Sequence, residues 1–337
     1  MDSHAPIPSV PGIDDPAVPT PPSDDPGPGA VWLPPARFAG PPQRHPWEIP
    51  MLVIVALISV LAYLACVVFV VLGDISDYAL LALLLPLIVF ASRGLMYASQ
   101  RVNGVQMSPT QFPEGYRILV ETAARYGLEY IPDAYVVTGN GQINAFASGH
   151  GFRRFIVVYS DLFEIGGKAR SPEALKFIIG HEVGHIAAGH VSYWRQLVTS
   201  TAMSIPILGS TLSRAQEYTA DNHGYYSCPA GAPPAMGVLA AGKYMLGAVN
   251  FDEFADRATH ERGFFVTVVN ALASHPVLTW RAAALRDRTR AGAMLLRPKQ
   301  VTRGTGSGNA VVIPTPPPPT SVPPGSLPNG LGEPPSF

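Results

Sequence analysis

The pentapeptide His181-Glu182-Val183-Gly184-His185 is the stretch on which the expected fold and chemistry depend. Residues four apart lie on one face of a helix, so His181 and His185 can each aim an imidazole nitrogen at one metal ion. The pattern is typical of zinc sites in which the carboxylate between the histidines takes a proton from a bound water as that water attacks a carbonyl group. Chance produces it in on the order of one chain per hundred of this length, so the surrounding sequence must decide.

A zinc site of this type needs a third protein ligand. One solution places another histidine soon after the pair, but the run reads HEVGHIAAGH, and His190 comes one residue early for that solution. Five residues past His185 correspond to about 140° around a continuing helix, so we expect His190 to point away from the metal. A capping or surface role is expected for it instead.

A second solution takes a glutamate from a separate downstream helix. The segment Arg214-Ala-Gln-Glu217-Tyr-Thr-Ala-Asp221 offers one. Glu217 and Asp221 share a helix face, so one carboxylate can bind the metal while the other orients a ligand imidazole. Two solvated acids would be the simpler interpretation, but the upstream HEVGH reverses that preference.

Four motifs occur in order along the chain: Asn144-Ala-Phe-Ala147, HEVGH at 181–185, EYTAD at 217–221, and His275-Pro276 followed by Arg281. With these motifs, the chain resembles the HtpX-like and CAAX-prenyl-protease group of integral-membrane zinc metallopeptidases over residues 95 to 290. The resemblance implies one Zn²⁺ per subunit, with His181, His185 and Glu217 as ligands and Glu182 as the catalytic base. Asp221 and Arg281 are then expected to support the ligands without binding the metal.

Short segments rich in β-branched and aromatic residues precede the HEVGH helix. Residues 134–138 and 155–159 are the clearest, and the turn signal Gly139-Asn140-Gly141 leads into 143–147. The pattern predicts a three-stranded meander. The resemblance implies that one of its strands is an edge on which an extended peptide lies, held by main-chain hydrogen bonds. Packing beneath the zinc helix is the equally weighted alternative for these edge residues, which are Asn144, Ala145, Phe146 and Ala147.

His275 is a candidate catalytic residue whose role stays open. Its imidazole can donate to the developing oxyanion, or it can occupy the open zinc position as an inhibitory latch. Capping of a helix near Pro276 is the structural alternative. Surface positions are expected for three further histidines that lack a partner at ligand spacing, namely His150, His223 and His260.

Composition indicates a membrane protein. Of 337 residues, 47% are hydrophobic and only 14% charged, which exceeds the apolar share of ordinary soluble domains. The uncharged run 49–72 makes a helix of about 36 Å, enough to cross a bilayer core of about 30 Å. It starts too far from Met1 for a cleavable signal peptide.

The run 78–92 is shorter and contains Pro86. We expect a second span here, with Arg93 extending to the bilayer surface and the helix continuing to residue 98. An interfacial or re-entrant helix is the alternative.

Charge favours a hairpin with both ends in the cytoplasm. The connection 73–77 carries two acids and no base, whereas arginines flank the two spans on their other sides. The zinc domain is therefore expected in the cytoplasm. The two cysteines, Cys66 and Cys228, predict no disulfide framework.

A further uncharged run, 197–213, is rich in Ser and Thr and contains Pro206. We expect a helical hairpin or loop near the membrane over the active site. A third span is disfavoured, because Glu217 would need another crossing to return.

The termini and the net charge define further expectations about partners. The 36 prolines concentrate near the two ends, so disordered tails are expected, with proline-binding modules as possible ligands of stretches such as 316–319. A net charge of −1 gives no nucleic-acid footprint, and no phosphate-binding GxxxxGK[ST] loop supports ATP dependence. The expected partners are the lipid bilayer and polypeptide substrates.

The predicted fold is α+β, a mainly helical zincin-type domain with a small β-meander, preceded by a two-helix transmembrane hairpin. The expected function is a membrane-anchored zinc endopeptidase acting on membrane or misfolded proteins in quality control. The alternatives are a zinc-stabilised holdase or scaffold without proteolysis, and a site-2-type intramembrane metalloprotease, which charges near the motif disfavour. The predicted parts are a disordered tail over 1–47, two transmembrane helices over 48–98, the peptidase domain over 99–295, and a second tail over 296–337.

Overall fold

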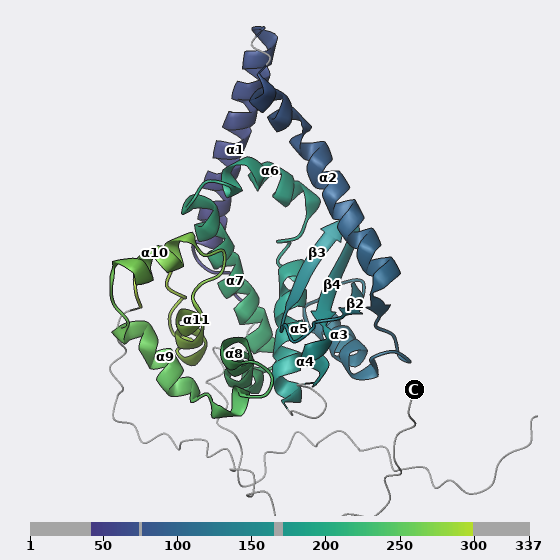
Figure 1. Cartoon of the computed structure of the whole chain (residues 1–337), viewed down its shortest axis with the longest axis vertical. Helices are drawn as coiled ribbons and strands as arrows, with labels where there is room; N and C mark the ends of the chain where they lie inside the picture. The colour runs from purple at the N-terminus through teal and green to yellow at the C-terminus, as the bar shows by residue number, and fades with distance from the viewer. Residues whose placement is uncertain (1–41, 74–75, 165–170, 299–337) are drawn as a thin grey trace, which may run out of the picture. The chain divides into compact units, whose positions relative to one another are not determined.

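The computed structural model describes residues 42–73, 76–164 and 171–298, and its helices and strands are labelled in Figure 1. The predicted proline-rich tails, with the 316–319 stretch, lie outside the described residues apart from 42–47 and 296–298. The side chain of His45 is buried, so packing begins before the predicted boundary at residue 48.

The first two helices, α1 (Glu48–Val71) and α2 (Asp77–Asn103), are the apolar ones. Their most apolar windows have mean hydropathies of 3.0 and 2.1, and only 11% of each window is buried within the protein. A core helix of a soluble domain would be mostly buried. Among the described residues, these two helices therefore have the length, composition and exposure that a membrane-crossing helix requires.

Helix α2 extends beyond the predicted end of the second span. Pro86 lies inside it, and the helix continues to Asn103. The guanidinium of Arg93 donates to the main-chain carbonyls of Gly149 and, at 2.6 Å, Val191. Its extension to a bilayer surface stays a prediction, but its side chain is held by the domain that carries the HEVGH segment. The last part of α2 thus packs on that domain.

The sheet has four strands in the order β1-β2-β4-β3. Strands β3 and β4 form an antiparallel hairpin, but β2 runs parallel to β4, so the sheet is mixed and the predicted meander is wrong. The turn signal is real, since Asn140 and Gly141 have φ angles of 50° and 85°, but this turn leads the chain to the far edge of the sheet. The strands are β1 (Val105–Gln106), β2 (Asp133–Val137), β3 (Ala145–His150) and β4 (Arg153–Tyr159).

Strand β4 lies inside the sheet, between β2 and β3, because both of its faces are apolar. Ile156 and Val158 pack in the main core, whereas Phe155 and Val157 form a second cluster with residues of α2. A strand buried on both faces reads as a continuous apolar run and lies inside a sheet. Strand β3 is consequently left at an edge.

Helices α5 (Pro172–Ala187) and α7 (Leu208–Ser227) form the centre of the domain. Ser171 caps α5 by accepting a hydrogen bond from the amide of Ala174, and Pro172 occupies the first turn. The two helices approach closely at Gly184, where an added Cβ would lie 2.5 Å from the Cβ of His223. This close approach brings the HEVGH segment against the face of α7 that carries Glu217.

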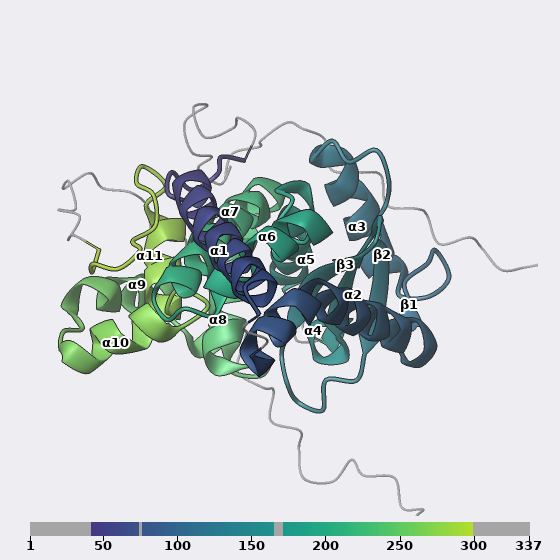
Figure 2. The ribbon, with the colours of Figure 1, turned by 90° about the horizontal axis from the view of Figure 1, so that it is seen from above.

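The run 197–213 forms the end of α6 (Tyr193–Met203), a short turn and the start of α7. The expected helical hairpin is therefore present. Helix α6 contacts both apolar helices (Figures 1 and 2), and the amide of Ala202 donates to the hydroxyl of Ser59 in α1 at 2.8 Å.

The remaining helices complete a mainly helical α+β fold with two apolar N-terminal helices, as predicted. The remaining elements are α3 (Pro113–Arg125), α4 (Ser160–Glu164), η3 (Pro229–Gly231), α8 (Ala232–Ala241), η4 (Leu246–Ala248), α9 (Phe251–His260), α10 (Phe264–Leu272) and α11 (Leu278–Arg286).

Candidate active site

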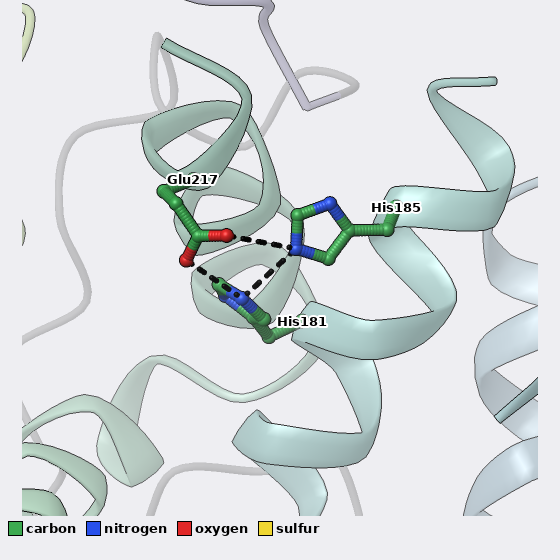
Figure 3. A group of neighbouring side chains, drawn as sticks. All are labelled: His181, His185 and Glu217. Carbon is green, nitrogen blue, oxygen red and sulfur yellow. Dashed lines mark hydrogen bonds and ion pairs between the residues drawn. The ribbon is translucent and has the colours of Figure 1, made fainter. Parts of the chain in front are cut away.

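Helix α5 brings the two histidines of the HEVGH segment together. Because they are four residues apart on one helix, their rings face the same side, and their Nε2 atoms lie 3.2 Å apart. His181 is buried and His185 is partly buried. Both nitrogens point toward α7 (Figure 3).

Helix α7 supplies the third group, Glu217. Its Oε2 lies 3.5 Å from Nε2 of His181, and its Oε1 lies 3.4 Å from Nε2 of His185. One donor atom from each of the three residues falls within 4.8 Å of the others, and Figure 3 shows the three side chains converging.

These three residues fit a zinc ion. Ligand bonds of 2.0–2.1 Å in a tetrahedral site place two donor atoms about 3.3 Å apart, close to the separations observed here. The Oε2 atom of Glu217 is buried and has no hydrogen-bond partner among the described residues, as expected of an oxygen that binds a cation. Two imidazoles and one carboxylate are also a donor set that zinc prefers.

The surroundings of His181 favour positive charge at this position. Burial favours the neutral ring, but the contact with Asp221 and the nearby Glu217 carboxylate outweigh burial and raise the pKa of His181 to about 10. A divalent cation bound at Nε2 would supply that charge in place of a proton.

Asp221 and Arg281 surround the ligands. Nδ1 of His181 lies 3.0 Å from Oδ1 of Asp221, and Arg281 donates to both oxygens of that carboxylate at 2.9 and 2.6 Å. Burial would raise the pKa of Asp221, but Arg281 and His181 lower it to about 2. An ionised Asp221 fixes Nδ1 of His181 as the donor, which leaves its Nε2 lone pair free for a metal.

Glu182 lies at the wall of a cavity of about 330 Å³ that His181, Glu217 and Arg281 also line. Its side chain is buried. Asn144 and Ala145 line the same cavity, so the beginning of β3 and the HEVGH helix face one space. The structure therefore brings the predicted base, the predicted ligands and the start of the predicted edge strand together.

The predicted edge residues begin one position before β3, at Asn144. Their position at an edge agrees with the strand order, because β3 pairs only with β4 within the described ranges. Ala145 and Ala147 pack against the main core, and Phe146 packs with the cluster beneath α2. The side chains thus serve packing, while the outer main-chain groups of β3 have no strand partner in the described part of the chain.

His275 also lines the cavity, with Nε2 3.5 Å from Oε1 of Glu217. Its side chain is 62% exposed, and Nδ1 lies 3.0 Å from the hydroxyl of Ser274. The capping alternative does not apply within the described chain, because α11 has Val277 at its N-cap without a side-chain cap. His275 is therefore a solvent-accessible group beside the three candidate ligands.

The predicted capping or surface role of His190 is wrong. It is buried rather than at the surface, and its Nδ1 lies 2.8 Å from Nδ1 of His185. The helix does not continue: Gly189 adopts a φ of 74°, and the amides of Gly189 and His190 bond back to the carbonyls of Ile186 and His185. This Schellman ending folds His190 back onto His185. The Gly-His dipeptide was the signal that could have revealed it.

The sequence prediction was also wrong for His223, and it did not include Glu48. His223 was expected at the surface but is buried, with Nδ1 2.8 Å from the carbonyl oxygen of Thr219. Glu48 is fully buried against His190, although no local pattern at the start of α1 indicates this contact. Of the remaining histidines, His260 is exposed as expected and His150 is partly buried.

A comparison with protein families agrees with this site. A family model described as Peptidase family M48 matches residues 109–207 and 193–289, which together exceed half of the chain and include every candidate ligand. The crystal structure of S. mikatae Ste24p is similar with a TM-score of 0.42 and 16% identity, covering 69% of this chain. The chain spans 66% of the length of that protein. No curated protein matches the sequence. By the extent of the family match, the chain belongs to peptidase family M48.

Proposed function

We propose that this chain is a membrane-anchored zinc endopeptidase that hydrolyses peptide bonds in membrane or misfolded proteins. The observation that carries the proposal is the convergence of His181, His185 and Glu217, together with Glu182 at the wall of the cavity that His181 and Glu217 line. Membership of a peptidase family supports hydrolysis of peptide bonds as the reaction.

The residues of the site have distinct chemical tasks in this proposal. When bound by His181, His185 and Glu217, zinc would supply a Lewis acid that polarises the scissile carbonyl and lowers the pKa of water. Glu182 accepts the proton of the attacking water and returns it to the leaving amine nitrogen. His275 donates a hydrogen bond to the carbonyl oxygen as negative charge develops on it, and its exposed position beside Glu217 supports this task.

Strand β3 is the proposed binding edge for the substrate. An extended peptide added to β3 would hydrogen-bond through its main chain, so the side chains of the substrate would contribute little to selection. The start of β3 borders the cavity that contains Glu182, which supports this position for the scissile bond. Such recognition suits unfolded polypeptides of varied sequence.

Helices α1 and α2 are the proposed membrane anchor, with the peptidase domain on the cytoplasmic side. Arg44 and Arg101 lie at the ends of the hairpin nearest the peptidase domain, whereas Asp77 lies at its connection. This distribution follows the positive-inside rule. The α6 to α7 hairpin, which contacts α1, is proposed to lie close to the membrane.

A zinc-dependent cleavage assay tests the proposal. The full-length protein, purified in detergent, is incubated with unfolded casein, with and without a zinc chelator. We expect cleavage that the chelator abolishes and that added Zn²⁺ restores. Cleavage that persists after the zinc has been removed would contradict the proposal, and a scaffold without proteolysis would give none under any condition.

A further inference from the structure

A row of buried polar side chains leads from the candidate metal site to the first residue of α1. Nδ1 of His185 lies 2.8 Å from Nδ1 of His190, and Nε2 of His190 lies 3.2 Å from Oε1 of Glu48. The exposed fractions of His190 and Glu48 are 2% and 0%. Solvent therefore cannot replace either contact.

The tautomers along this row follow from the geometry. Nε2 of His185 faces His181 and Glu217, so its lone pair is the one available to a metal and its Nδ1 carries the hydrogen. Nδ1 of His190 must then accept that hydrogen bond. The remaining hydrogen of His190 is on Nε2, where it donates to Glu48. One tautomer of each ring satisfies every contact.

Glu48 is itself held in place by three other side chains. Nη2 of Arg195 lies 2.9 Å and Nη1 of Arg44 2.6 Å from its Oε1, and the hydroxyl of Thr219 donates to its Oε2. These partners come from α6, from the segment before α1 and from α7. A buried carboxylate with this many charged and polar partners has a fixed position.

We propose that His190 and Glu48 are positioning residues that fix the tautomer and orientation of His185 as a metal ligand. The inference rests on the ligand assignment in the proposed function. It gives the two histidines equivalent support: Asp221 holds His181 directly, and Glu48 holds His185 through His190. The first residue of the proposed membrane anchor thereby becomes part of the structure that supports the metal site.

Zinc affinity of the full-length protein in detergent tests the inference, measured by competition with a chelating dye. Partners of ligand histidines contribute about 10- to 100-fold to metal affinity. We expect His190→Phe, which removes both ring nitrogens, to raise the Kd for Zn²⁺ by about that factor. His190→Gln retains an acceptor and a donor and should keep the Kd within about threefold of wild type. The visible absorption of the Co²⁺-loaded protein should change in His190→Phe and return toward wild type in His190→Gln.

The matched control is His223→Phe, the same substitution at a buried histidine that bonds to a main-chain carbonyl. It should leave the Zn²⁺ Kd within about threefold of wild type even where thermal stability falls. An equal change in Kd for His190→Phe and His223→Phe, or an unchanged Kd in His190→Phe, would overturn the inference.

Glu48→Gln serves as a second variant of nearly unchanged volume, which is informative if His190→Phe does not fold. We expect its Kd for Zn²⁺ to rise by about tenfold, and a wild-type Kd would overturn the role of Glu48. These measurements do not depend on proteolysis. A wild-type protein that binds zinc but cleaves no polypeptide would contradict the proposed function and leave this inference intact.

Discussion

Nδ1 of His181 lies 3.0 Å from a carboxylate oxygen of Asp221, which follows the candidate ligand Glu217 by one helical turn on α7. One face of one helix thus supplies both a ligand and the group that orients another ligand. Arg281 binds that same carboxylate from α11. The metal site therefore depends on the packing of three helices.

Replacement of Arg281 should destabilise the protein strongly. Arg281→Met leaves the buried Asp221 carboxylate without its guanidinium partner, and breaking a buried pair costs about 3–5 kcal/mol. Chemical unfolding in detergent measures this loss. The control is Arg286→Met, which removes a partly exposed pairing with Asp252 and Asp256 and should cost under about 1 kcal/mol. Equal losses in the two variants would contradict the assigned importance of the Arg281 pair.

The same pair predicts how stability depends on pH. The lowered pKa of Asp221, about 2, means that its ionised form stabilises the fold. This contribution is fully present above the unfolded pKa of about 3.9 and is lost as the pH falls through about 2. The stability difference between wild type and Asp221→Asn, a side chain that does not titrate, should therefore stay constant between pH 5 and 6 and shrink only in stronger acid. A difference that is already lost at pH 5 would contradict this assignment.

Removal of Glu217 should abolish stable zinc binding. Glu217→Ala deletes one of three candidate donors, and zinc sites with two protein ligands are weak. Metal analysis after dialysis should find about one zinc per chain in wild type and almost none in the variant. Glu121→Ala, which breaks an exposed pairing with Lys176, should retain zinc. Full zinc occupancy in Glu217→Ala would show that Glu217 is not a ligand.

Substitution of His275 separates its two proposed roles. As an oxyanion donor, its loss in His275→Phe should lower kcat by about 100-fold with zinc content unchanged. Steady-state cleavage of a fluorogenic peptide by zinc-loaded protein measures the effect. A rate above wild type would instead support the inhibitory latch, and an unchanged rate would exclude both roles.

Thiol labelling tests the membrane topology. In a variant whose native Cys66 and Cys228 are replaced by alanine, single cysteines are introduced at the exposed positions Leu72 and Phe152. An impermeant reagent should label the Leu72→Cys protein in intact cells and the Phe152→Cys protein only in inside-out vesicles. Labelling of Phe152→Cys in intact cells would show that the peptidase domain lies on the opposite side of the membrane from the proposed one.

Local geometry explains what could be predicted from the sequence. Residues four apart share one face of a helix. Once the HEVGH segment and the segment from Glu217 to Asp221 are assigned to helices, the sequence therefore predicts which side chains lie on the same face. The apolar helices followed from composition. The sequence also contains a local signal for helix α9, because Asn250 caps this helix by accepting a hydrogen bond from the amide of Glu253. The helix was not predicted because it is short.

Non-local contacts explain what could not be predicted. The order of the strands depends on which faces of β4 are covered, and that depends on α2, more than fifty residues earlier in the chain. The contact between Glu48 and His190 joins residues 142 positions apart. His190 lies in a different place from the predicted one because Gly189 ends α5 and reverses the direction of the chain.

The central claim, that Glu182 acts as the base of a zinc peptidase, is tested most directly by comparing wild type with Glu182→Gln on unfolded casein. Both proteins are first shown to contain one zinc per chain, and initial rates of cleavage are then measured. We predict that the variant retains zinc and loses at least about 100-fold in rate, because the side chain that accepts the proton is gone. Equal rates in the two proteins, or no cleavage by zinc-loaded wild type, would contradict the account.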